Sequence, residues 1–143
     1  MMRVLYSAAV WLAQPLVRRK LRRRAAAEPL YGEHIAERFG YYTQPAPAAG
    51  EGPWVWLHAV SLGETLAAAT LVAALRQQLP GMRLLLTHGT ATGRAAGVRL
   101  LQPGDVQVWQ PWDTVGAVRR FLAHFRPQLG LLMETELWPN LVA

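Results

Sequence analysis

Cysteine is absent from the 143-residue sequence. Without it the chain can form neither a disulfide framework nor a thiolate metal site, the features that most often identify small secreted and zinc-binding domains. Phosphate-binding fingerprints are absent too, because no Gly-x-Gly-x-x-Gly motif and no Gly-Lys-Ser or Gly-Lys-Thr of the Walker type occurs. The sequence therefore does not indicate a classical dinucleotide-binding domain, and we predict no cofactor and no bound metal.

Acidic residues are absent from the first 27 positions, which contain seven Arg or Lys. The rest of the chain holds eight basic and nine acidic residues, so the formal net charge of +6 comes from the N-terminus. A nucleic-acid-binding domain would carry its positive charge across a face of the folded part. A single basic arm instead predicts contact with an anionic membrane surface, and we expect no nucleic-acid partner.

Long hydrophobic runs are also absent. The longest apolar stretch, residues 4–17, has 14 positions and is interrupted by Gln14 and Pro15, whereas a membrane-spanning helix needs about 20 residues. Its basic cluster follows the apolar stretch, which is the wrong order for a secretory signal. Tyr6 and Trp11 suit the headgroup region, so we predict that residues 1–27 are an arm whose helix lies in the membrane interface. A helix packed on the protein's own core and a tilted membrane span are the alternatives.

Residues 28–53 are expected to form a short helix and an exposed linker rich in Pro, Ala and Gly. From residue 54 onward, short apolar runs alternate with segments of helical spacing. This alternation predicts an α/β fold, a Rossmann-like parallel sheet with flanking helices. Strands are expected at 54–60, 82–87, 106–109 and 129–133, and helices at 63–79, 92–101 and 115–125.

The first of these helices is expected to pack on the sheet through one face, formed by Leu66, Ala69, Thr70, Ala73 and Ala74. At the other end of the chain, residues 138–141 have the pattern of a helix start, and the sequence stops within that first turn. We therefore expect residues 54–143 to be an incomplete domain of a longer protein.

In a parallel α/β sheet, ligands bind beyond the carboxyl ends of the strands. The loop after the first strand contains Ser61, Gly63 and Glu64. Two interpretations remain open for it: Ser-x-x-Glu is a helix capping box, and a carboxylate in this position is also a reasonable general base. His58 and His88 have no metal-binding spacing and are expected to make ordinary hydrogen bonds.

Two further loops contain candidate site residues. Thr90, Thr92 and Gly93 precede a helix whose first N–H groups could hold an anion, although a plain threonine cap explains them equally well. Glu134 and Glu136 follow the last strand, where acidic residues are unusual; the simpler interpretation is a helix start stabilised by negative charge.

Several segments together resemble a known family. They are YGEHIAERFG, HAVSLGET, LLLTHGTATGR, QPWDT, VRRFLAHFRP and LLMETELWPN. In this order and spacing they closely resemble the N-terminal domain of bacterial transferases of 3-deoxy-D-manno-octulosonic acid (Kdo), which add Kdo to the lipid A precursor in lipopolysaccharide core biosynthesis.

The resemblance implies the N-terminal domain of a two-domain GT-B glycosyltransferase that is inverting and metal-independent. CMP-Kdo would be the donor and the lipid A precursor (lipid IVA) the acceptor, at the cytoplasmic face of the bacterial inner membrane. The family's proposed base, the glutamate of the SxGE turn, corresponds to Glu64. Candidate acceptor-binding residues, placed by loop position as much as by the family, are Ser61, Gly63, Thr90, Thr92, Gly93 and Glu136.

The donor-binding domain has no counterpart in this sequence. We therefore expect the isolated 143-residue chain to be inactive, with CMP-Kdo bound by the missing C-terminal domain. Two other functions are compatible with the residues: a different GT-B transferase that acts on a lipid-linked acceptor, and a non-catalytic membrane-binding α/β module.

Overall fold

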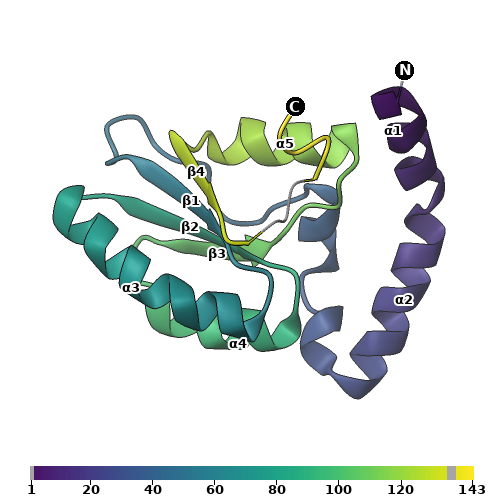
Figure 1. The fold of residues 1–143 in the computed structure, drawn as a ribbon, viewed down its shortest axis with the longest axis horizontal. Helices are drawn as coiled ribbons and strands as arrows, with labels where there is room; N and C mark the ends of the chain where they lie inside the picture. The colour runs from purple at the N-terminus through teal and green to yellow at the C-terminus, as the bar shows by residue number, and fades with distance from the viewer. Residues whose placement is uncertain (1, 135–137) are drawn as a thin grey trace.

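A computed structural model describes residues 2–134 and 138–143 of the chain. Its centre is a sheet of four parallel strands in the order β3-β2-β1-β4 (Figure 1). The strands are β1 (Trp54–His58), β2 (Arg83–His88), β3 (Val106–Trp109) and β4 (Leu129–Leu132). The predicted parallel α/β fold is confirmed, and each strand lies within two residues of its expected bounds.

Helices cover both faces of the sheet (Figure 1). Helices α3 (Leu62–Gln78) and α4 (Ala91–Gly97), followed by the 3₁₀ helix η3 (Val98–Leu100), lie on one side, and α5 (Val115–Phe125) lies on the other. Each of the three α-helices begins with a side-chain cap, since Ser61, Thr90 and Thr114 accept a hydrogen bond from the backbone N–H three residues later.

Successive side chains of each strand point to opposite faces of the sheet, so the sheet has a hydrophobic core on each face. On the α5 side, Trp54 and Trp56 of β1 pack with Phe121 and Phe125. On the α3 side, a second cluster joins Val55, Leu57, Leu84, Leu86, Ala68 and Val72. A strand buried on both faces is apolar at successive positions. For this reason β1 and β2 could be predicted from the sequence.

The predicted packing face of α3 is wrong. The helix buries Thr65, Ala68 and Val72, whereas Leu66 is 59% exposed, and of the expected face only Ala69 is even partly covered. Apolar residues surround this Ala- and Leu-rich helix almost evenly, so periodicity does not select one face. The face that packs on the sheet includes Thr65, which is 1% exposed and whose hydroxyl donates to Ser61 O at 2.7 Å.

Residues 28–53 contain two short 3₁₀ helices, η1 (Pro29–Gly32) and η2 (Ile35–Phe39). From η2 the Glu37 carboxylate, only 2% exposed, accepts hydrogen bonds from Arg94 Nη1 at 2.9 Å and from Trp109 N at 2.8 Å. A hydrogen-bonded ion pair of this kind fastens the segment to α4 and to β3. Residues 43–53 have no regular structure and are mostly exposed.

The N-terminal arm forms two helices, α1 (Met2–Leu12) and α2 (Gln14–Ala27), along one side of the molecule (Figure 1). Pro15 lies in the first turn of α2, where its missing N–H removes no helical bond. Helix α1 buries no residue, but Leu21 of α2 packs with Tyr31 and Trp109. The arm contacts the protein's own core through the basic helix α2, and not through the apolar helix that the alternative prediction placed there.

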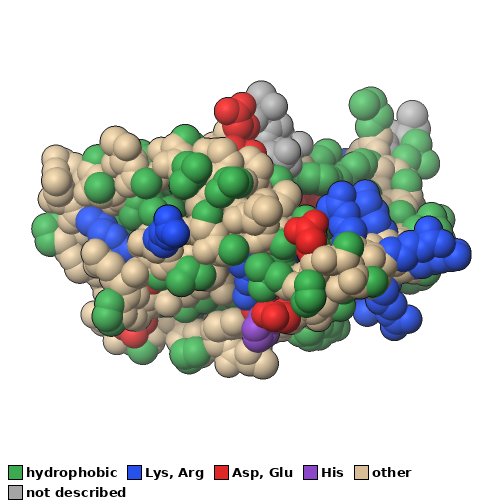
Figure 2. Space-filling view, turned by 90° about the horizontal axis from the view of Figure 1, so that it is seen from below, with side chains coloured by type: hydrophobic (Ala, Val, Ile, Leu, Met, Phe, Trp, Pro, Cys, Tyr) green, Lys and Arg blue, Asp and Glu red, His purple; other side chains and the backbone are tan. Residues whose placement is uncertain are grey.

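Basic side chains gather at the end of the molecule where the arm lies (Figure 2). Apolar side chains of the arm are exposed as well, including Leu5 at 65%, Trp11 at 64% and Leu12 at 68%. Among the described residues, no helix is both long enough and apolar enough to cross a bilayer.

Candidate functional site

The loops that follow the strands meet at the carboxyl edge of the sheet. Gly89 N and Thr90 N, after β2, donate to Val60 O, after β1, at 3.2 and 3.0 Å. The loop after β3 is joined to the C-terminal segment, because Asn140 N donates to Asp113 Oδ2 at 3.1 Å. The two pairs are joined in turn, because Gln110 N, after β3, donates to His88 O at 3.0 Å. The loops after β1, β2 and β3 and the described C-terminal segment therefore form one surface, as expected for a parallel sheet.

Glu64 lies in the first turn of α3, and its carboxylate is held by the turn that precedes the helix. Val60 N donates to Oε2 at 2.7 Å, and the Ser61 hydroxyl donates to Oε1 at 2.8 Å. In return, Glu64 N donates to Ser61 Oγ at 3.4 Å. The capping interpretation is confirmed, with Val60 N as the group that Glu64 reaches. Each carboxylate oxygen still has a lone pair for a further hydrogen bond.

Gly63 lies next to Glu64 at the exposed start of α3. A Cβ atom at this position would meet nothing within 4 Å, so the glycine leaves open space beside the Glu64 backbone. Gly93 has the opposite surroundings. A Cβ atom there would lie 2.9 Å from Val60 O, which means that this glycine allows α4 to pack closely against the β1–α3 turn.

Thr90 and Thr92 differ in what they contact. The Thr90 hydroxyl donates to Val60 O at 2.9 Å and accepts from Gly93 N at 3.2 Å, so it is used by the fold. Thr92 is exposed.

Glu136 lies outside the described residues. Glu134 is exposed and has a φ of 62°, a left-handed conformation that is uncommon for a residue other than glycine.

His58 and His88 end β1 and β2 and are fully buried. His58 Nδ1 lies 2.8 Å from Thr87 Oγ1, and His88 Nδ1 lies 2.8 Å from Ala59 O. The expectation of ordinary hydrogen bonds is confirmed. Burial lowers the pKa of both imidazoles from 6.5 to about 4, so both are neutral at pH 7. Within the described residues, His, Asp and Glu side chains form no cluster that could hold a metal ion.

Beside this surface lies a cavity of about 260 Å³, which we call the basic cavity. Its lining includes Arg24, Arg38, Gly89, Thr90, Trp112 and Asp113. The sequence predictions missed it, because its walls come from α2, η2, the loops after β1, β2 and β3, and the C-terminal segment. A smaller cavity of about 150 Å³ shares several of these residues and extends along α2 to Lys20.

Arg38 is the most deeply buried basic group of the basic cavity, at 8% exposure. Its guanidinium lies 4.0 Å from the centre of the Trp109 ring, and Nη2 donates to Gly89 O at 3.2 Å. Burial lowers its pKa to about 10, so the group stays positively charged at neutral pH.

Asp113 connects the cavity with α1 and with the C-terminal segment. Tyr6 OH donates to Asp113 Oδ2 at 2.8 Å, and Asn140 Nδ2 donates to Asp113 O at 2.7 Å. Ser7 Oγ donates to Asn140 Oδ1 at 3.0 Å. Burial, together with Asp113, raises the pKa of Tyr6 to about 12. These contacts hold α1 against the mouth of the sheet through polar groups, while its apolar residues stay exposed.

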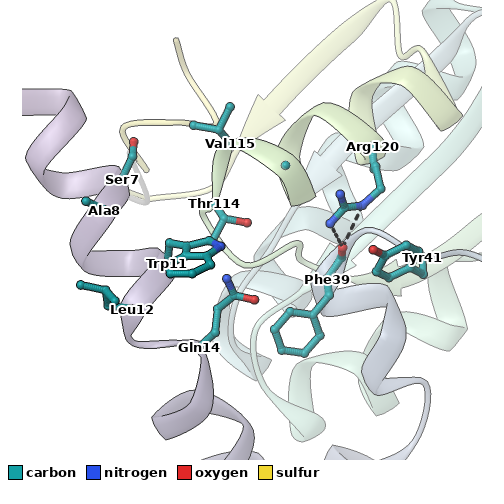
Figure 3. Close-up of a pocket in the computed structure, with 11 residues that line it drawn as sticks. Ser7, Ala8, Trp11, Leu12, Gln14, Phe39, Tyr41, Thr114, Val115 and Arg120 are labelled. Atoms are coloured by element: carbon teal, nitrogen blue, oxygen red, sulfur yellow. Dashed lines mark hydrogen bonds between the residues drawn. The ribbon is translucent and has the colours of Figure 1, made fainter.

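A larger cavity of about 780 Å³ separates the arm from α5 (Figure 3). Trp11, Leu12 and Gln14 line it from the arm, and Thr114 and Arg120 line it from the loop before α5 and from α5 itself. Arg120 Nη2 donates to Phe39 O, so that guanidinium is turned toward the protein.

Comparisons with known proteins agree over most of the chain. Residues 33–143 match the family described as 3-deoxy-D-manno-octulosonic-acid transferase (kdotransferase). A 3-deoxy-D-manno-octulosonic acid transferase of Bordetella pertussis is 55% identical over 111 residues, covering 74% of this chain and 25% of the relative. One of Haemophilus influenzae is 32% identical over 142 residues, covering 99% of this chain and 33% of the relative.

A probable mitochondrial 3-deoxy-D-manno-octulosonic acid transferase of Arabidopsis thaliana is 33% identical over 96% of this chain and 30% of the relative. The chain therefore spans between a quarter and a third of the length of these curated relatives. No solved structure matches the chain with significant similarity.

Proposed function

The chain belongs to the 3-deoxy-D-manno-octulosonic-acid transferase family, and we propose that it is the acceptor-side part of a GT-B glycosyltransferase that moves Kdo from CMP-Kdo to a lipid A precursor. The family match over residues 33–143 is the observation that carries the proposal. The parallel sheet and the carboxylate of Glu64 at its carboxyl edge support it, because this is the edge where α/β sheets bind ligands.

In the proposed reaction, Glu64 is the general base. The acceptor hydroxyl loses its proton to the Glu64 carboxylate while its oxygen bonds to the anomeric carbon of Kdo. The bond from that carbon to the phosphate of CMP breaks, and CMP leaves with the electron pair. One displacement inverts the anomeric centre. The proton transfer needs only a base and no metal, and the open space beside Gly63 gives the acceptor access to Glu64.

A chimeric enzyme tests the proposed function. The part of the Bordetella pertussis relative that matches this chain is replaced by residues 1–143, and transfer of Kdo from CMP-Kdo to a lipid A precursor is measured. We expect transfer by the chimera and none by the isolated 143-residue chain, which has no donor-binding half in this proposal. A folded chimera that transfers no Kdo contradicts the proposal, and turnover by the isolated chain contradicts the need for a second half.

The arm is expected to bind the protein to the cytoplasmic face of an anionic membrane. Arg19 and Arg22 are exposed on α2, and each basic residue near an anionic surface contributes about 1 kcal/mol to binding. The double variant Arg19→Gln/Arg22→Gln should therefore bind phosphatidylglycerol vesicles roughly 10- to 30-fold more weakly in a flotation assay. Added salt should reduce the difference.

The matched control changes two exposed arginines outside the arm, Arg99→Gln and Arg119→Gln, and so alters the net charge equally. Its binding to the same vesicles should stay close to that of the unchanged protein. If both double variants lose the same affinity, net charge rather than the arm governs binding. If deletion of residues 1–27 leaves vesicle binding intact, the membrane assignment of the arm is wrong.

A further inference from the structure

The basic cavity is lined by two cations, Arg24 and Arg38, and by one carboxylate, Asp113, which forms no ion pair with either among the described residues. The ion pairs among the described residues join Glu37 to His34 and Arg94, and Arg76 to Asp105. Arg24 and Arg38 are therefore not within 4 Å of a described carboxylate oxygen. Burying a cation without a partner is costly, so the 8% exposure of Arg38 calls for a compensating anion.

The nearest acidic residue in sequence, Glu37, favours the charged form of Arg38 from a distance but makes no ion pair with it. Glu37 directs its carboxylate to Arg94 Nη1, to Trp109 N and, at 2.8 Å, to Gln44 Nε2. Arg38 lies against the Trp109 ring and donates to a carbonyl oxygen, Gly89 O. Its charge is stabilised by these contacts but not neutralised.

Unsatisfied polar atoms gather around the same cavity. Within the described residues, Arg38 Nε, Trp112 Nε1 and Asp113 Oδ1 are buried and have no hydrogen-bond partner, and all three residues line the basic cavity. Buried polar groups almost always have partners, so each exception needs an explanation. Three such exceptions around one cavity, two donors and one acceptor, are typical of a site that a polar ligand completes.

The remaining walls indicate what kind of ligand fits. The indole rings of Trp112 and Trp138 lie 6.4 Å apart between centroids, inclined at 48°, and present flat apolar faces. Asp113 offers a carboxylate oxygen to a hydroxyl or amide donor. The volume of about 260 Å³ is near the lower limit of small-molecule sites, roughly 300 Å³, so the cavity has room for one sugar unit rather than a whole glycolipid.

We propose that the basic cavity binds a phosphorylated sugar, with the phosphate against Arg24 and Arg38, the sugar ring against Trp112 and a sugar hydroxyl at Asp113. A guanidinium pairs with phosphate oxygens through two parallel N–H bonds. The inference deepens the proposed function, on which it rests: the ligand is the phosphorylated sugar headgroup of the acceptor. The cavity shares Val60 and Thr90 with the Glu64 turn, so its occupant lies next to the proposed base.

Soluble probes test the site in the 143-residue chain itself. N-acetylglucosamine 1-phosphate, N-acetylglucosamine and inorganic phosphate are titrated separately, and the indole Nε1–H signal of Trp112 is followed by NMR. We expect the sugar phosphate to shift this signal at concentrations at least tenfold below those of the other two probes. Binding of inorganic phosphate as tight as that of the sugar phosphate overturns the assignment, because the sugar then contributes nothing.

Variants identify the groups that hold the phosphate. Arg24→Gln should weaken binding of the sugar phosphate about tenfold, the usual loss for a hydrogen bond to a charged group, and should leave N-acetylglucosamine binding unchanged. Arg38→Gln should act in the same way. Arg23→Gln is the matched control, because Arg23 is exposed on the same helix and does not line the cavity. Equal losses in all three variants, or no loss in Arg24→Gln, overturn the proposal.

The chimera separates this inference from the proposed function. There, Arg24→Gln should raise the KM for the phosphorylated acceptor about tenfold with little change in kcat, and should not alter the KM for an acceptor treated with phosphatase. If the chimera transfers no Kdo while the probes bind as described, the proposed function fails and the cavity assignment stands. If transfer occurs with equal KM for both acceptors, the cavity assignment fails and the function stands.

Discussion

Replacing Glu64 by Gln in the chimeric enzyme should lower the rate of Kdo transfer by roughly 10² to 10⁴, the usual contribution of a general base. Thermal stability should hardly change. The Gln oxygen can accept from Val60 N, and its amide can donate to Ser61 Oγ, so the two contacts that the carboxylate makes with the turn are both retained. Gln cannot accept the proton of the acceptor hydroxyl, and the loss is therefore expected in kcat.

Ser61→Ala is the control that removes the cap and keeps the base. The Ser61 hydroxyl accepts from Glu64 N and donates to Glu64 Oε1, and loss of a helix N-cap costs about 1 kcal/mol of stability. The rate should fall much less than in Glu64→Gln. If Glu64→Gln keeps most of the activity and Ser61→Ala only lowers the melting temperature, the turn is structural, and Glu136 becomes the next candidate for the base.

The sequence predicted those features of the site that depend on neighbours along the chain. The contacts of Ser61 and Glu64 were predictable because a capping box joins residues three positions apart. Strands β1 and β2 were predictable because buried parallel strands are continuous apolar runs. The face of α3 was not, since its apolar residues lie on all sides and the buried face depends on long-range packing, in which Ala68 and Val72 contact β1 and β2.

The basic cavity could not be predicted for a different physical reason. Arg24 and Trp112 are 88 positions apart in the sequence, and they line one cavity only because Leu21 packs α2 against Tyr31 and Trp109. The basic residues of α2 look alike in the sequence, and nothing local distinguishes Arg24 from Arg23. Such a site becomes visible only when the long-range packing of the arm is known.

The second large effect concerns acid stability. Between pH 6.5 and about 4, His58 and His88 are neutral in the folded protein and protonated in the unfolded chain, because burial lowers both pKa values. The unfolded state therefore binds more protons in this window, and the free energy of unfolding must fall as the pH falls. Each histidine contributes up to about 1.4 kcal/mol per pH unit. The slope fades above pH 6.5, the ordinary pKa of histidine, as the unfolded chain loses its protons.

The contacts of the two rings explain why protonation is unfavourable. His58 Nε2 is buried and has no partner among the described residues. A proton there would bury a positive charge on an N–H group that has no acceptor among them. His88 Nδ1 lies 2.8 Å from Ala59 O, which makes it the donor, and Nε2 accepts from Gln107 Nε2 at 3.0 Å. Gln107 Nε2 also donates to Arg94 O at 2.8 Å. A second proton on His88, at Nε2, would therefore point at the Gln107 Nε2–H group, which these two contacts hold in place.

Urea unfolding of the 143-residue chain at pH values from 7.5 to 4.5 measures this effect. The free energy of unfolding should be roughly 3 to 5 kcal/mol lower at pH 4.5 than at pH 7.5 from the two histidines together, with most of the loss below pH 6. His58→Gln and His88→Gln should each remove about half of the slope that the two histidines contribute between pH 6.5 and 5. Where a variant does not fold, NMR titration of the imidazoles in the unchanged protein decides the matter: ring signals of His58 and His88 that titrate near pH 6.5 would show that both buried rings accept protons as easily as free histidine.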